Sequence, residues 1–185
     1  MLFRSIEAIR KDRARFAIRS QCRPQTPEPG PWLVFALLKR DATDLVVQKA
    51  TELGVSALLP IFTDRTNSGR TNEARLAAIA IEAAEQCERL TVPIIHKPQK
   101  LHEVLSNWPN GRRLFAAMER QQAAPLRPAS RAALLVGPEG GFAPAELDAL
   151  RGCSFVTPVT LGPRVLRAET ACLAGLALLQ APGLA

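Results

Sequence analysis

Apolar residues gather in short runs along the chain, and the segments between these runs carry apolar residues at helical spacing. The runs predict buried strands, which are residues 32–38, 56–62, 93–96, 114–118, 132–136 and 155–161. The predicted helices are residues 41–53, 73–90 and 101–105, one that begins at Pro144 and a last one that contains Ala171 to Leu179. Because strands and helices alternate, we expect an α/β domain with a mainly parallel sheet.

Side-chain stripes distinguish two of the predicted helices. Helix 73–90 carries Glu82, Gln86 and Arg89 at i, i+4 and i+7, so these polar side chains share one face that is expected to be solvated. The polar stretch 64–72 after strand 56–62 is expected to be a plain connection or, as a weaker alternative, a mobile loop. The apolar stripe of helix 41–53 consists of Ala42, Leu45, Val46, Ala50 and Leu53.

The first 24 residues are strongly basic and hold most of the chain's net charge of +7. Alternating residues at 3–9 and 13–19, joined by Lys11 and Asp12, predict a two-stranded hairpin with its arginines on one face. A concentrated basic segment suits a polyanion binder, although a solvated surface that keeps the protein soluble is the alternative. The hairpin favours RNA, and the expected contacts are Arg4, Arg10, Lys11, Arg13 and Arg15.

Length and composition indicate one main domain and exclude several classes of protein. Of the 185 residues 47% are hydrophobic, so the chain can bury one substantial core. Residues 1–24 form a front segment, the Pro-rich stretch 25–31 a linker, and residues 32–185 the main domain. Four widely spaced cysteines and two histidines indicate neither a metal site nor a disulfide framework, and no apolar stretch is long enough to span a bilayer. We therefore expect a reduced, cytoplasmic protein.

Two glycine-containing turns follow the last two predicted strands, at residues 137–141 and 161–166. Glycine lets main-chain groups come close to a ligand, so a site built mainly from backbone is expected. The first turn lacks the Gly-Lys-Ser/Thr ending of a P-loop and the three-glycine spacing of a dinucleotide fold, which argues against nucleotide hydrolysis. Glu146, next to Pro144 at a helix start, is expected to cap the helix rather than to catalyse.

Four ordered motifs of this chain resemble those of a bacterial family, ribosomal RNA small subunit methyltransferase E of the SPOUT superfamily. They are residues 48–55 (QKATELGV), 82–89 (EAAEQCER), 137–142 (GPEGGF) and 161–171 (LGPRVLRAETA). The resemblance covers about residues 32–181 and implies a deep trefoil knot in the C-terminal part, a feature nearly absent from other proteins. Residues 1–24 resemble only the end of the family's PUA-like β-barrel, which binds RNA.

Three positions depart from the family motifs. Ala143 and Cys87 stand where the family usually has Ser, and Ala168 where it usually has Thr. Ala143 removes a side-chain acceptor at a helix start, so we expect a weaker helix cap there.

The resemblance implies that the two turns hold S-adenosylmethionine, with main-chain groups recognising adenine and leucines contacting its ring. Core packing is the alternative role, weighed equally for Leu135 and less for Leu166, and the glycines alternatively serve the turns alone. The expected cofactor-binding residues are Leu135, Gly137, Pro138, Glu139, Gly140, Gly141, Leu161, Gly162, Arg164 and Leu166.

The family's reaction methylates N3 of a uridine in 16S ribosomal RNA, uridine 1498. The uridine must lose its N3 proton and lie in line with the methyl group. Arg167 or Arg89 would stabilise charge on the uracil oxygens, and Glu139 and Glu169 are the carboxylates in the motifs. We expect Arg167 in the substrate site and Glu169 as base or positioner, with a structural role for Glu169 at the start of the last helix almost as well supported.

The sequence thus predicts an S-adenosylmethionine-dependent RNA methyltransferase whose partner is 16S ribosomal RNA or the small ribosomal subunit. The resemblance also implies a homodimer in which the last helix contacts a second copy, with an internal core helix as the alternative. Two other functions stay open. One is a SPOUT methyltransferase that modifies a ribose 2′-hydroxyl or another base, and the other is a non-catalytic RNA-binding protein.

Overall fold

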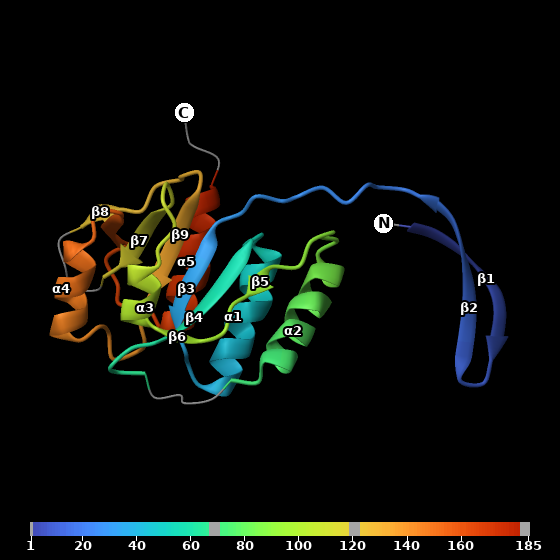
Figure 1. The fold of residues 1–185 in the computed structure, drawn as a ribbon, viewed down its shortest axis with the longest axis horizontal. Coiled ribbons are helices and arrows are strands. Elements are labelled where there is room, and N and C mark those ends of the chain that lie inside the picture. The colour runs from blue at the N-terminus through green and yellow to red at the C-terminus, as the bar shows by residue number, and fades with distance from the viewer. Residues whose placement is uncertain (1, 67–70, 119–122, 182–185) are drawn as a thin grey trace.

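A computed structural model describes residues 2–66, 71–118 and 123–181 of the chain. Its main domain is a parallel sheet in the order β5-β4-β3-β9-β7-β10-β8, with β6 beside β4 (Figure 1). The strands are β3 Trp32–Ala36, β4 Ala57–Phe62, β5 Ile94–Ile95, β6 Gln99–Lys100, β7 Arg113–Ala117, β8 Ala124–Pro125, β9 Ala132–Val136 and β10 Val156–Thr160. The helices are α1 Arg40–Glu52, α2 Glu73–Gln86, α3 Leu101–Ser106, α4 Pro144–Gly152 and α5 Ala168–Gln180.

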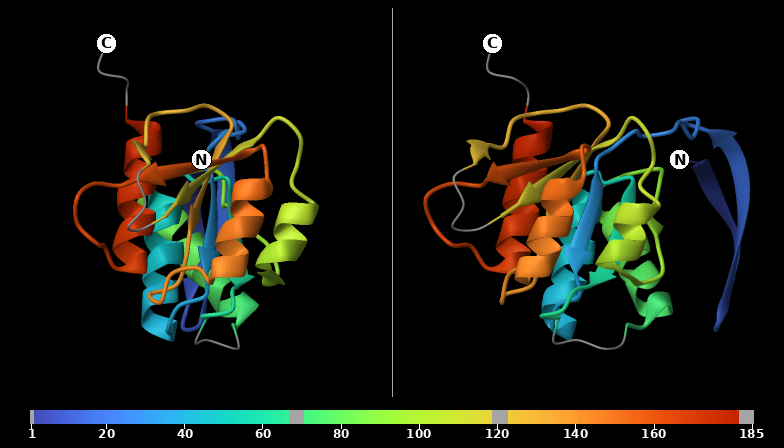
Figure 2. Two further views of the ribbon diagram at one scale, coloured as in Figure 1. Left: turned by 90° about the vertical axis from the view of Figure 1, so that its left-hand side faces the viewer. Right: turned by 60° about the vertical axis from the view of Figure 1, so that its left-hand side comes forward.

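Helices cover both faces of the sheet, which confirms the predicted α/β class. Figure 2 shows α1 and α5 on one side of the strands and α3 and α4 on the other. Every residue of β9 is buried, as expected for a parallel strand covered on both faces. Leu134 and Val136 pack toward α1 and α5, whereas Leu135 packs toward α3 and α4. The position of β9 between β3 and β7 is compatible with the expected knot, which stays a prediction.

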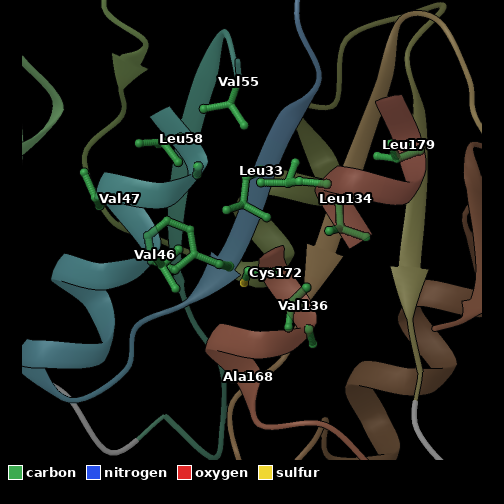
Figure 3. Packing of buried hydrophobic residues seen from close by; sticks show 14 of the residues in the cluster. Leu33, Val46, Val47, Val55, Leu58, Leu134, Val136, Ala168, Cys172 and Leu179 are labelled. Atoms are coloured by element: carbon green, nitrogen blue, oxygen red, sulfur yellow. The ribbon is translucent and has the colours of Figure 1, made fainter. Parts of the chain in front are cut away.

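The larger core lies between the sheet and the α1/α5 layer (Figure 3). Leu33 and Leu58 from the strands meet Val46 from α1 and Cys172 from α5, and all four are fully buried. Gly175 brings α5 very close to β9, since a Cβ there would lie 2.5 Å from a Leu134 methyl. This close packing fixes the middle of α5 against the middle of β9.

Two helices differ from the sequence prediction in detail. Leu45 is 38% exposed, and α1 buries Thr43, Val47 and Thr51 beside Val46 and Ala50, so the buried stripe is rotated from the expected one. Helix α2 ends at Gln86 rather than near residue 90.

The early end of α2 has a local cause. Glu88 takes a left-handed conformation with φ of 60°, and the Arg89 amide bonds back to the Ala84 carbonyl at 2.9 Å. This closure ends the helix in the manner of a Schellman-type cap. Arg89 therefore does not share a helical face with Glu82 and Gln86, and that expectation was wrong.

The basic front segment forms the predicted antiparallel hairpin, β1 Leu2–Arg10 and β2 Arg13–Gln21. Successive residues of β2 point to opposite faces, so Arg13, Arg15 and Arg19 share one face. The opposite face carries Ile6, Ile9, Phe16 and Ile18, each more than half exposed. Figure 1 shows the hairpin apart from the main domain, joined to it by the linker.

Polar contacts anchor the linker on the main domain, which its composition did not predict. The Gln25 amide donates to the Leu90 carbonyl at 2.9 Å, and Ser56 donates to the Gly30 carbonyl at 2.8 Å. Glu28 forms an ion pair with Arg89 at 2.9 Å. The connection thus packs through hydrogen bonds rather than through apolar side chains.

Candidate functional site

A cavity of about 450 Å³ opens at the carboxyl ends of β7, β9 and β10. These strands are neighbours in the sheet, with β7 between the other two, so the loops that follow β9 and β10 meet at one edge. We call residues 137–141 the first loop and residues 161–166 the second loop. The loops and strand ends contribute these lining residues: Ala117, Met118, Val136, Gly137, Pro138, Glu139, Gly140, Gly141, Val159, Thr160, Leu161, Gly162, Pro163, Arg164, Val165 and Leu166.

The first loop is a tight turn closed by its own backbone. The Gly141 amide donates to the Pro138 carbonyl at 2.8 Å, and Gly141 has a φ of 67°. A side chain would strain this left-handed conformation, which explains a glycine here. All five residues of the turn line the cavity.

The second loop is held at its start by Thr160. Its hydroxyl donates to the Gly162 carbonyl at 3.1 Å and accepts from the Gly162 amide at 3.3 Å. Gly162 has a φ of 125°, which side-chain-bearing residues rarely adopt. Leu161 and Leu166 pack partly against the α1/α5 core while also lining the cavity. The second loop therefore offers both backbone groups and apolar surface.

Glu146 caps α4, as predicted, and also ties two segments together. Its carboxylate accepts the Ala143 amide at 2.8 Å and the Asp64 amide at 3.0 Å. Ala143 itself provides no side-chain cap, as expected. One carboxylate thus joins the start of α4 to the turn after β4.

Arg65 lies in the stretch that is predicted to be a plain connection, and it lines the same cavity. Its Nη1 donates to the Gly140 carbonyl at 2.7 Å. Thr63 and Thr66 close the turn that carries it, through a 2.9 Å contact of their hydroxyls. A polar stretch directly after a buried parallel strand was the available signal, since loops at that sheet edge build sites.

The two loops bring together nine of the ten predicted cofactor residues, and Leu135 is the exception. Its side chain is fully buried and belongs to the core under α3 and α4. Its alternative role, core packing, is the one that agrees with this position.

The predicted catalytic residues lie beside the cavity or away from it. Glu139 lines it. Arg167 and Glu169 flank a lining residue, Ala168, but neither lines the cavity itself. The Arg167 Nη1 lies 4.0 Å from the Glu169 Oε1. The Arg167 side chain is 85% exposed, so this ion pair is weak.

Arg89 is a structural residue within this chain. Its side chain is 8% exposed and donates to the Thr51 and Val55 carbonyls at 2.6 and 3.1 Å, as well as to Glu28. These contacts close the end of α1 and hold the linker, away from the cavity. Within one chain, Arg89 therefore serves the packing of the linker and not the cavity.

The start of α5 holds one strongly perturbed group near the cavity. Burial raises the pKa of the Cys172 thiol well above its usual range, and the nearby Glu169 carboxylate raises it further. Cys172 is fully buried, so it stays protonated and packs as an apolar residue.

The cavity fits S-adenosylmethionine in size and lining. A volume of about 450 Å³ lies within the range of small-molecule sites, and mixed apolar side chains and backbone polar groups are typical of them. Among the residues that the structure describes, no cluster of His, Cys, Asp or Glu could hold a metal ion. No helix in the described ranges has the length and apolar character needed to cross a membrane.

Comparison with known proteins gives the site its context. The sequence profile of the RNA methyltransferase domain matches residues 27–180. Ribosomal RNA small subunit methyltransferase E of Rickettsia conorii is 33% identical over 178 residues, covering 93% of this chain and 72% of that protein. The chain spans 62% of the corresponding Bacillus subtilis protein, with 30% identity.

Two solved structures are similar in fold and sequence. One is ribosomal RNA small subunit methyltransferase E from Neisseria gonorrhoeae bound to S-adenosylmethionine, with a TM-score of 0.81, 31% identity, and coverage of 94% of this chain and 75% of that one. The other is a methyltransferase from Legionella pneumophila with bound S-adenosylmethionine, with a TM-score of 0.83, 31% identity, and coverage of 96% and 77%. With a shared profile, sequence and fold, this chain belongs to the ribosomal RNA small subunit methyltransferase E family.

Proposed function

We propose that this protein transfers a methyl group from S-adenosylmethionine to N3 of a uridine in small-subunit ribosomal RNA, uridine 1498 of 16S RNA. The observation that carries the proposal is the shared cavity of the first and second loops, in a chain of this family. The cofactor supplies an electrophilic methyl group on sulfur when it is bound. The residues of the chain would bind the cofactor, position the uridine and accept its N3 proton.

The two loops would hold the cofactor through their main chain. The glycines of the first loop leave its backbone groups open to a ligand, and Leu161 and Leu166 offer apolar contact for adenine. Pro138, Glu139 and Arg164 complete the rim of the site. Leu135 is not in this set, because it packs in the core.

Two charged residues are proposed to act on the uridine. Arg167 precedes α5 with its guanidinium exposed, where it can neutralise charge on the uracil oxygens as the N3 proton leaves. Glu169 is the second residue of α5, with its side chain largely buried, and would position Arg167 or accept the proton. Glu139, which lines the cavity directly, is the competing proton acceptor.

A pair of isosteric Glu→Gln variants separates the two carboxylates. If Glu169 handles the proton, Glu169→Gln lowers kcat strongly and leaves the affinity for S-adenosylhomocysteine, measured by calorimetry, unchanged, while Glu139→Gln has little effect on kcat. The reverse pattern assigns the proton to Glu139. Unchanged turnover in both variants would exclude either carboxylate as the base.

The hairpin is proposed to bind RNA through its basic face. Arg10 pairs with Arg13 across the hairpin, Arg15 follows on the same face, and Lys11 lies in the turn. Arg4 pairs with Ile18, a residue of the opposite face, so it would contact RNA from the other side of the hairpin. Neutralising phosphates releases counterions, so binding through this face should weaken steeply with salt. The proposed partner is 16S ribosomal RNA or the assembling small subunit, and a ribosomal substrate would place the protein in the cytoplasm.

We also propose a homodimer. Leu45 on α1 and Leu178 on α5 are each more than a third exposed, and these two helices are neighbours on one face of the domain. A second copy that covers this face would shield both residues. A monomeric mass by light scattering at micromolar concentration would count against the dimer.

The reaction is tested by incubating the protein with S-adenosylmethionine and small ribosomal subunits that lack uridine N3 methylation. A methyl group on N3 occupies the base-pairing edge, so primer extension should stop at the modified uridine. A ribose 2′-O-methyl group leaves that edge free and instead blocks alkaline cleavage, which identifies the first alternative function. Absence of S-adenosylhomocysteine binding by calorimetry would support a non-catalytic RNA-binding protein and would overturn the proposal.

A further inference from the structure

The turn after β4 places one arginine on the rim of the cavity. Arg65 is exposed to solvent, lines the cavity and touches the first loop at Gly140. Only one of its five N–H groups is used in that contact. Among the described residues it forms no ion pair, unlike Arg89 or Arg75.

Hydrogen bonds of the neighbouring residues hold the turn that carries Arg65. The Asp64 amide donates to Glu146, and the Thr63 amide donates to the Thr66 hydroxyl at 2.9 Å. The turn is therefore held both to itself and to the start of α4. A guanidinium held in this way loses little conformational freedom when it binds a ligand.

A second arginine lies across the opening. Arg164 belongs to the second loop, after β10, whereas Arg65 follows β4. In the sheet, β4 and β10 lie on opposite sides of β9, from which the first loop extends. The two arginines thus come from segments on opposite sides of the first loop, and both residues are exposed.

Building on the proposed function, we propose that Arg65 binds a phosphate of the RNA strand next to the methylated uridine. A planar guanidinium with unused donors is suited to phosphate. Its exposure on the rim favours a group that arrives from solvent over a part of the cofactor enclosed by the loops. The hydrogen bond to Gly140 joins this phosphate site to the loop that would hold the cofactor, so the RNA strand and the methyl donor share one rigid support.

The carboxylate of the cofactor's methionine tail is the competing ligand for Arg65. Calorimetry with S-adenosylhomocysteine and with methylthioadenosine, which lacks that carboxylate, separates the two ligands. We expect Arg65→Ala to bind both compounds as the wild type does, within about twofold. A selective loss of S-adenosylhomocysteine affinity would assign Arg65 to the cofactor and overturn the proposal.

Steady-state kinetics give the first direct test. With tritiated S-adenosylmethionine and small ribosomal subunits that lack N3 methylation, Arg65→Ala should raise the KM for subunits by about tenfold or more, because a charge-assisted contact is lost. The KM for S-adenosylmethionine should not change. Arg65→Lys should recover part of the loss, since it keeps the charge but not the planar fork.

The matched control is Arg113→Ala. Arg113 is exposed at the first residue of β7, at the opposite edge of the sheet from the cavity. The Arg113→Ala substitution removes the same charge as Arg65→Ala, so a general electrostatic effect would appear in both variants. An equal rise in KM for Arg113→Ala, or no rise for Arg65→Ala, would overturn the proposal while leaving the proposed function intact.

A binding measurement keeps the proposal testable even if the protein does not methylate the subunits. Fluorescence anisotropy of a labelled oligouridylate, with protein saturated by S-adenosylhomocysteine, gives the dependence of affinity on salt. Losing one phosphate contact should make the slope of log K against log salt shallower by about 0.7 in Arg65→Ala. Arg65→Lys and Arg113→Ala should keep the wild-type slope, and an unchanged slope in Arg65→Ala would refute the phosphate contact.

Discussion

The Glu146 carboxylate joins two parts of the chain that lie 82 residues apart in sequence. It accepts one amide from the start of α4 and one from the turn that carries Arg65. Because Ala143 offers no cap, this acid provides the side-chain acceptor at that helix end. The negative charge also suits the amino end of a helix.

We predict that Glu146→Ala lowers the free energy of unfolding by about 1–2 kcal/mol, because two amides lose their acceptor. Urea denaturation followed by circular dichroism measures this change. Glu146→Gln keeps one carbonyl acceptor, so its free energy of unfolding should fall by only part of that amount. If Glu146→Ala unfolds at the wild-type urea concentration, the bridge between α4 and the turn contributes nothing.

The exposed cysteine and the buried cysteine should differ sharply in reactivity. Cys22 is exposed, whereas Cys172 is fully buried and its pKa is raised by burial and by Glu169. Alkylation of Cys172 requires opening of the core, which costs at least about 5 kcal/mol, so it should react more than about a thousandfold slower than Cys22. Peptide mass spectrometry after timed iodoacetamide treatment tests this. Comparable rates in the native protein would show that α5 opens readily.

At the residue scale, the sequence located the two loops but not every side chain around them. The glycines that follow each strand predict a turn, and this prediction located the loop residues. The family resemblance implied a cofactor contact for Leu135, but a strand covered on both faces carries no pattern that tells which face a residue takes. Arg65 was missed because its contact is with a residue 75 positions away.

Helix α5 packs on β9 through a glycine. A Cβ at Gly175 would lie 2.5 Å from a fully buried Leu134 methyl, which has no open space to move into. We predict that Gly175→Ala destabilises the fold by about 1–3 kcal/mol through overpacking, despite the better helix propensity of alanine. Denaturant midpoints measure the effect.

Gly152 is the matched control for this substitution. It also lies in a helix, α4, but a Cβ there meets nothing within 4 Å. Gly152→Ala should be neutral or stabilising by up to about 1 kcal/mol. If both variants behave alike, the approach of α5 to β9 is looser than the distances indicate.

At the element scale, apolar runs predicted the central strands because burial on both faces demands continuous apolar residues. β9 has the predicted bounds, and the other central strands shifted by one or two residues. The two-residue strands β6 and β8 were missed, since so short a pairing leaves no periodic pattern. The end of α2 was missed because Glu88 takes the left-handed conformation that glycine normally signals.

At the scale of the whole molecule, a single ion pair helps to connect the hairpin's linker to the main domain. Glu28 accepts from Arg89 at 2.9 Å and from Thr91 at 3.0 Å. These hydrogen bonds, the one from Arg89 first, lower the pKa of the Glu28 carboxyl below its usual value of 4.5. Arg89 is itself tied to the end of α1, so the linker is attached to the body of the domain.

The lowered pKa sets the direction of a pH effect. The folded protein holds Glu28 ionised more strongly than the unfolded chain does, so its contribution to stability is present above pH 4.5 and is lost as pH falls through the folded pKa below that value. We expect the linker to become more sensitive to an acid-active protease, such as pepsin, over this range. Cleavage near residues 24–31, mapped by mass spectrometry, follows the release.

Glu28→Gln separates this ion pair from general acid unfolding. The variant lacks the titrating group, so its linker should be cleaved already at the highest pH of the series, with a rate that changes less as pH falls. Proteolysis within the main domain should follow the same pH curve in both proteins. If the linker of wild type and variant is cleaved at equal rates throughout, Glu28 does not hold it, and the hydrogen bonds of Gln25 and Ser56 are sufficient to anchor the hairpin's connection to the main domain.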